Sequence, residues 1–308
     1  MSDLPARVRI HEEGPREGFQ IESGVIATAD KIRFIEALAC TGVPQIDCVS
    51  YVSAKRVPGM ADADDVARGI HKRPGVRYTG LWLNTRGLER ALELPLDRVG
   101  AVRVTASETF CRRNTGMSID QTFDEQRNWL RLYREHAIEV EWAYVMTAFG
   151  CNFEGEIPVN QVVRIIERLK GLEVEQAVRF KGIYLADTVG RGSPLSIERR
   201  IGALRERWPD LRIGLHLHDT RGTGMANAYA ALRLGVDQFD STCAGLGGCP
   251  FAGHQGASGN ICTEDLVYMC HEMGIETGID LRAMAECARM AEHIVGHPLP
   301  GKLMHTAF

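Results

Sequence analysis

The segment LHLHDTRG, residues 215–222, places two histidines two positions apart with an aspartate directly behind them. In an extended strand, residues i and i+2 face the same side, so His216 and His218 point in one direction. Two imidazoles at this spacing can share a divalent ion, whereas burying them without partners costs about 1–3 kcal/mol each. The pair therefore predicts either a metal site or two core histidines satisfied by neighbouring groups.

Polar residues also stand at the ends of the other apolar, β-branched segments. In chain order they are Arg16 and Glu17, then Asp47, Ser50 and Ser53, then Asn84, Ser107, Glu108, Thr147, Asp187 and Asp219. The last such segment leads into AGLGGCPFAGHQGASGN, which contains Cys249, His254 and Asn260. A carboxylate and an asparagine near the histidines strengthen the metal interpretation, because mixed nitrogen and oxygen ligands suit Mg²⁺ or Mn²⁺.

Two further residues each have a structural and a chemical interpretation. Arg16 either forms a surface ion pair with Glu12 or Glu13, or binds a carboxylate or an enolate oxygen. Cys249 either stands in its loop by chance or acts as an acid or nucleophile, and its glycine and proline neighbours indicate an exposed backbone. The residue types alone leave both alternatives open.

The elements that must position these residues alternate between strands and amphipathic helices. The predicted strands are residues 7–13, 45–51, 77–83, 100–106, 139–146, 179–186, 212–218 and 236–242. The predicted helices are residues 28–41, 62–72, 86–94, 118–136, 158–171, 194–207, 224–234, 263–273 and about 281–295. Ser118 is expected to cap its helix, and Gly42, Gly235 and Gly274 are expected to end theirs.

Eight βα units predict an α/β fold, a (β/α)8 TIM barrel with an additional C-terminal helix. We expect one domain over residues 1–308, with the barrel at about 7–275 and a helical extension at 276–308. The competing open, doubly wound sheet usually carries a GxGxxG turn after its first strand, and EEGPREGFQ lacks that motif. A barrel also explains why the polar residues follow strands, because βα loops carry its chemistry.

The composition narrows the class of protein. The chain has 308 residues, of which 44% are hydrophobic, so it can form a large core. A formal net charge of −4 without a basic run argues against nucleic-acid binding, and no apolar segment approaches a membrane span. Nine cysteines without CxxC spacing favour reduced thiols. We therefore expect a soluble cytoplasmic protein that binds neither nucleic acid nor membrane.

Long segments resemble the hydroxymethylglutaryl-CoA lyase family, within the metallolyase barrels related to isopropylmalate synthase. EEGPREGFQIE resembles the family's EVGPRDGLQNE, and VSYVSAKRVPGMAD resembles its TSFVSPKWVPQMAD. TASETFCRRNTGMSI, GCNFEG and LADTVGRGSP resemble the family's segments in the same order, and the region from HLHDTRG to EDLVYM is the most similar. These motifs extend from the first predicted strand to the last.

The resemblance implies a reaction, a cofactor and roles for individual residues. The reaction would be a metal-assisted retro-Claisen cleavage of 3-hydroxy-3-methylglutaryl-CoA, or a related acyl-CoA, to acetyl-CoA and a keto acid. A divalent cation, Mg²⁺ or Mn²⁺, would be bound by Glu17, His216, His218 and Asn260. Arg16 would stabilise the enolate, Glu17 or His216 would accept a proton, and Cys249 would supply one. Asp47, Asp187, Ser107 and Gln20 would contact or orient the substrate, and the protein would form a homodimer.

The chain departs from the family pattern at two places. Glu17 stands where the family has aspartate, and Asp47 stands where it has glutamate. The glycine-rich loop also has two extra residues near Gly253 and His254. Three alternatives to the lyase stay open. Two are enzymes of the same superfamily, a condensing synthase and a keto-acid aldolase. The third, a catalytically silent barrel that binds acyl-CoA, is the one that these differences would support.

Overall fold

The computed structural model describes residues 4–22, 24–248 and 259–306. These residues form two compact units. The central unit consists mainly of residues 99–238, and the terminal unit consists mainly of residues 6–98 together with residues from 239 to the end of the chain. Each unit contains four parallel strands that alternate with helices.

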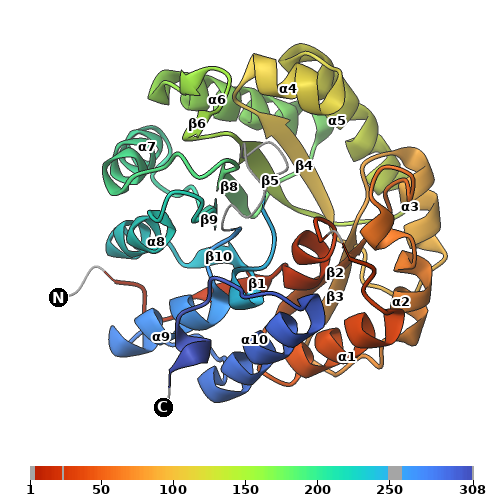
Figure 1. The fold of residues 1–308 in the computed structure, drawn as a ribbon. Coiled ribbons are helices and arrows are strands. Elements are labelled where there is room, and N and C mark those ends of the chain that lie inside the picture. Colours follow the sequence, from red (N-terminus) through yellow and green to blue (C-terminus); the bar gives the residue numbers. More distant parts are fainter. Residues whose placement is uncertain (1–3, 23, 249–258, 307–308) are drawn as a thin grey trace. The chain divides into compact units, whose positions relative to one another are not determined.

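The central unit is built on four parallel strands. In spatial order they are β4 (Gly100–Thr105), β5 (Val140–Met146), β8 (Gly182–Asp187) and β9 (Ile213–Leu217), shown in Figure 1. Strands β8 and β9 are buried along their whole length, as expected for parallel strands covered by crossover helices. The helices are α4 (Glu108–Thr115), α5 (Ile119–Glu135), α6 (Val159–Gln176), α7 (Pro194–Arg207) and α8 (Gly224–Arg233). A two-stranded hairpin, β6 (Gly150–Cys151) and β7 (Gly155–Glu156), follows β5.

The terminal unit combines the first three strands with the last one. Their order is β3 (Arg77–Leu81), β2 (Gln45–Ser50), β1 (Arg9–Glu12) and β10 (Gln238–Ser241). The helices are α1 (Thr28–Ala39), α2 (Ala63–Gly69), α3 (Thr85–Leu92), α9 (Thr263–Glu272) and α10 (Leu281–Val295). The unit also has four short helical turns, η1 (Gly14–Gly18), η2 (Pro58–Met60), η3 (Cys243–Gly245) and η4 (Leu303–His305). The first of them, η1, is a single π-helical turn, and the others are 3-10 turns. The additional helix α10 packs against α1 and α9.

Helix boundaries follow local capping chemistry. Ser118 caps α5, because its hydroxyl accepts a hydrogen bond from the Gln121 amide at 3.1 Å while the Gln121 side chain accepts one from the Ser118 amide at 2.8 Å. Ser193 and Ser196 form the same reciprocal pair at the start of α7. Such caps stabilise a helix by about 1 kcal/mol each. The predicted cap at Ser118 is confirmed.

The predicted elements agree with the structure in type and order. Helix α6 continues to Gln176, five residues beyond its predicted end, and strand β8 begins at Gly182, three residues after its predicted start. Two further elements were not predicted. Helix α4 was not predicted, because only Phe110 and Cys111 of its eight residues are buried and it therefore has no apolar stripe. The β6–β7 hairpin is too short to show the alternation of a strand. In the described part of the chain, no helix combines the length and the apolar character that a membrane span needs.

Candidate active site

Arg16 lies in the π-helical turn η1 of the terminal unit and contacts three carboxylates. Its Nε donates to Asp47 Oδ2 at 2.8 Å, its Nη1 donates to Glu17 Oε1 at 2.7 Å, and its Nη2 donates to Glu13 Oε2. Only 9% of Arg16 is exposed, so these are largely desolvated, charge-assisted hydrogen bonds. The predicted alternative of an ion pair with Glu13 is therefore present, but it is buried rather than on the surface.

The charges in this cluster do not balance. One guanidinium stands against the carboxylates of Glu13, Glu17 and Asp47, which gives a formal net charge of −2. Burial acts to lower the pKa of Arg16, but the carboxylates of Glu17, Glu13 and Asp47 outweigh it and hold that pKa well above its usual value. Arg16 therefore stays protonated.

Glu12 holds the turn that carries Arg16. Its Oε1 accepts hydrogen bonds from the Gly14 amide at 2.7 Å and the Cys243 amide at 2.9 Å, and its Oε2 accepts one from Thr263 Oγ1 at 2.6 Å. Burial raises the pKa of Glu12 to about 7 although these donors lower it. No motif in the sequence predicts this role of Glu12, whose only signal is an acidic residue at the end of an apolar strand.

Asn260 extends the cluster from the far end of the chain. Its Nδ2 donates to Glu17 Oε2 at 2.5 Å, which identifies Oδ1 as the remaining acceptor. Among the residues that the structure describes, this oxygen has no hydrogen-bond partner, and Asn260 is 1% exposed. A buried amide oxygen without a donor is expected to meet a ligand.

Gly247 allows Glu17 and Asn260 to approach each other. Its φ is +93°, and a Cβ at this position would lie 3.1 Å from Glu17 Cβ and 3.2 Å from Asn260 Nδ2. A larger residue would therefore be strained and would push the two side chains apart.

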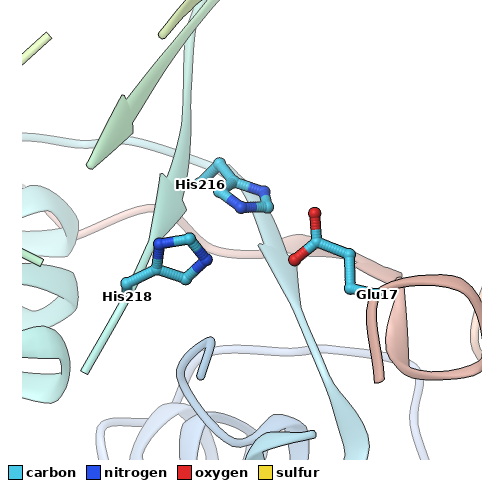
Figure 2. A group of neighbouring side chains, drawn as sticks. All are labelled: Glu17, His216 and His218. Atoms are coloured by element: carbon cyan, nitrogen blue, oxygen red, sulfur yellow. The ribbon is translucent and has the colours of Figure 1, made fainter. Parts of the chain in front are cut away.

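The two histidines are part of the central unit. His216 is in β9 and His218 is one residue beyond its end, and their rings project to the same side (Figure 2). Their ring centroids lie 5.1 Å apart with an interplanar angle of 81°. His218 Nδ1 lies 2.8 Å from the Thr188 carbonyl oxygen. Because a carbonyl can only accept, Nδ1 carries the proton and Nε2 presents a lone pair, which is the tautomer that binds metals.

Asp187 and Ser107 have partners within the central unit. Asp187 is fully buried and accepts hydrogen bonds from the amides of Arg191 and Gly192, both at 2.8 Å. Burial raises the pKa of Asp187, although both amides oppose the shift. Ser107 caps α4 by accepting from the Phe110 amide at 3.1 Å, and it contacts Cys151 Sγ at 3.2 Å. Both residues organise loops, and their contact with substrate stays a prediction.

The remaining predicted residues are placed as follows. Gln20 is half-buried in the turn after η1. Cys249 and His254 lie outside the described residues. Asn84 caps α3 by accepting from the Gly87 amide at 2.9 Å, and Asp219 accepts from the Gly224 amide at 2.6 Å. Some polar residues at strand ends therefore serve the following helix rather than a ligand.

Comparison with known proteins identifies the fold and the class of enzyme. A solved structure of an HMG-CoA lyase from Acinetobacter baumannii, in complex with coenzyme A and 3-methylmalate, is 35% identical with a TM-score of 0.86, and the match covers 100% of this chain and 96% of that one. Hydroxymethylglutaryl-CoA lyase YngG from Bacillus subtilis is 40% identical over 97% of this chain and 96% of its own length. The 3-hydroxy-3-isohexenylglutaryl-CoA/hydroxymethylglutaryl-CoA lyase of Pseudomonas aeruginosa is 37% identical, with 96% and 95% covered.

The chain is thus a carbon–carbon lyase with the (β/α)8-barrel fold, which confirms the predicted fold class and enzyme class. A family model described as HMGL-like matches residues 7–291, and the chain belongs to that family. The predicted resemblance to hydroxymethylglutaryl-CoA lyases is confirmed by the same findings.

Proposed function

We propose that this lyase cleaves 3-hydroxy-3-methylglutaryl-CoA, or a closely related 3-hydroxyacyl-CoA, in a retro-Claisen reaction that requires a divalent cation. The products are acetyl-CoA and a keto acid, which is acetoacetate for the methyl substrate. The names of the relatives support this substrate class. The observation that carries the cation requirement is the buried Oδ1 of Asn260, whose Nδ2 is bound to the Glu17 carboxylate.

The proposed ligands of the cation are Glu17, His216, His218 and Asn260. Glu17 offers a carboxylate oxygen, and His216 and His218 each offer a ring nitrogen, as the side chains in Figure 2 show. Two imidazole nitrogens with carboxylate and amide oxygens form a donor set suited to Mg²⁺ or Mn²⁺. The Thr188 carbonyl supports the ligand role of His218 because it sets the ring tautomer.

When bound, the cation lowers the pKa of the substrate hydroxyl. In the proposed reaction Glu17 or His216 accepts the hydroxyl proton, and the C2–C3 bond then breaks to leave a carbonyl and a thioester enolate. Arg16, held protonated by its carboxylates, stabilises the enolate oxygen. Cys249 donates the proton that converts the enolate to acetyl-CoA. Asp47 keeps Arg16 in place, and Asp187, Ser107 and Gln20 complete the substrate-binding residues.

The proposal extends to organisation and partners. We propose that the two units form one barrel domain over residues 1–308, that acyl-CoA is the substrate, and that the protein is a homodimer in the cytoplasm. The eight described cysteines are all free thiols, which supports a reducing compartment. Light scattering of the purified chain tests the homodimer directly.

The experiment that tests the function is a substrate panel with and without metal. The chain is treated with a chelator and assayed for acetyl-CoA release from several 3-hydroxyacyl-CoAs, before and after addition of Mn²⁺ or Mg²⁺. We expect activity only with added cation, and the preferred substrate identifies the acyl group. Full activity in the metal-free protein would exclude the cation requirement. Condensation without cleavage would identify a synthase, and binding without turnover would identify a silent barrel.

A further inference from the structure

Glu13 is the third carboxylate on Arg16, and nothing in the proposed reaction uses it. It precedes Arg16 by three residues in the chain and contacts Nη2, whereas Asp47 contacts Nε and Glu17 contacts Nη1. Glu13 is 9% exposed. Burying a carboxylate costs free energy unless a partner compensates the lost hydration. A functional role therefore explains the buried Glu13–Arg16 ion pair better than the ordinary pairing of two solvent-exposed charges does.

The three carboxylates fix the guanidinium completely. Asp47 alone would leave the outer nitrogens of the planar group free to turn about the Nε contact. With Glu13 and Glu17 also bound, every nitrogen of Arg16 has a carboxylate partner, which sets both the plane and the direction of the group.

Two of the carboxylates on Arg16, those of Glu13 and Glu17, lie at positions where this chain differs from the quoted family segment. The family segment EVGPRDGLQNE has valine at the position of Glu13 and aspartate at that of Glu17. Asp47, in turn, is shorter by one methylene than the glutamate of the family. Relative to the quoted family residues, this chain has an extra carboxylate at Glu13 and a shorter one at Asp47, and both contact the same guanidinium.

We propose that Glu13 is a positioning residue for Arg16 and that its charge also strengthens cation binding. The inference rests on the proposed function, because it assigns Arg16 to the enolate and Glu17 and Asn260 to the cation. The positioning effect depends on the reach of the Glu13 side chain. The effect on the cation depends on its negative charge, which acts over several ångströms in a partly desolvated site.

Two variants separate reach from charge. Glu13→Gln keeps the length and an oxygen acceptor for Arg16 but removes the charge. Glu13→Asp keeps the charge but shortens the side chain by one methylene. Glu286→Gln is the matched control, because Glu286 also pairs with an arginine three residues later but is exposed on α10. Each protein is measured for Mn²⁺ affinity by electron paramagnetic resonance, for kcat and KM at saturating Mn²⁺, and for melting temperature.

We expect Glu13→Gln to weaken Mn²⁺ binding at least fivefold and to lower kcat at saturating Mn²⁺ less than Glu13→Asp does. We expect Glu13→Asp to keep Mn²⁺ affinity within twofold and to lower kcat at least fivefold with little change in KM. A merely structural role would lower the melting temperature without this separation between affinity and turnover.

Two results would contradict the proposal. A kcat within twofold for Glu13→Asp would overturn the positioning role, and an unchanged Mn²⁺ affinity for Glu13→Gln would overturn the electrostatic role. Failure of the unchanged protein to bind Mn²⁺ or to cleave any hydroxyacyl-CoA would instead overturn the proposed function, so the two failures are distinguishable.

Discussion

The side-chain nitrogen Nδ2 of Asn260 donates a hydrogen bond to Glu17 Oε2 at 2.5 Å. This bond joins residues that are 243 positions apart in the chain. This hydrogen bond fixes which end of the Asn260 amide is the donor. The acceptor end is buried and has no partner among the residues described, and Glu17 Oε1 is bound to Arg16. One carboxylate therefore links the arginine proposed to stabilise the enolate with the amide proposed to bind the cation.

Asn260→Ala removes both the amide oxygen and the support of Glu17. We expect Mn²⁺ affinity to fall at least about tenfold, because one ligand is lost and another is no longer held in place. Titration calorimetry of the metal-free chain measures this change. Asn128→Ala, at an exposed position on α5, is the control. Equal Mn²⁺ affinity in all three proteins would remove Asn260 from the cation site.

Arg16→Met removes the guanidinium that the buried carboxylate of Glu13 and the half-buried carboxylates of Glu17 and Asp47 contact. We expect kcat/KM to fall by more than about 100-fold because the enolate loses its main donor. The free energy of unfolding should also decrease by about 3–5 kcal/mol, since breaking a buried ion pair leaves uncompensated charge. Arg16→Lys should recover part of the stability but little of the activity, because an ammonium cannot reproduce the planar fork. Kinetics and urea unfolding test both statements, and a mild loss of activity would mean that Arg16 only binds substrate.

Cys249→Ala should lower kcat far more than it raises KM, because the thiol is proposed to donate a proton after the bond has broken. Cys40→Ala, which replaces an exposed thiol, serves as the control. Steady-state kinetics at saturating cation measure the difference. Unchanged turnover would show that another group protonates the enolate.

Glu264 should make stability depend on pH. Burial raises its pKa from 4.5 to about 8, so the folded protein holds a proton that the unfolded chain releases between these values. Stability from this group is therefore complete below about pH 4.5 and is lost as the pH rises towards 8, with a slope of at most about 1.4 kcal/mol per pH unit. Glu264→Gln removes this pH dependence. In chemical denaturation, the free energy of unfolding of the variant relative to that of the original protein should therefore increase between pH 5.5 and 7.5. A constant difference between the two proteins would contradict the prediction.

The sequence predicted most of the fold because the strands are continuous apolar runs and the helices carry apolar stripes. The observed bounds of β5, Val140–Met146, and α7, Pro194–Arg207, differ little from those predicted. Helix α4 and the β6–β7 hairpin were missed because neither has a periodic apolar pattern.

The candidate site was predicted less completely. His216, His218, Arg16 and Glu17 could be selected because their types and spacing suit a metal and an anion. The sequence offered Glu12 and Glu13 equally as surface partners of Arg16. It could not predict that Glu13 forms the pair in a buried position while Glu12 binds backbone amides, because this depends on where the first strand ends and how the following turn winds. Two adjacent glutamates look alike in a sequence, yet one holds the backbone of the turn and the other holds Arg16.

The carboxylate of Glu12 also sets an order of events during biosynthesis. Its partners Cys243 and Thr263 are made 231 and 251 residues after it. A ribosome that has produced three quarters of the protein has therefore not yet supplied the groups that secure the arginine-bearing turn. The nascent polypeptide can form these hydrogen bonds only after residue 263 has been made, so fragments that end before it should lack the contacts that hold the turn.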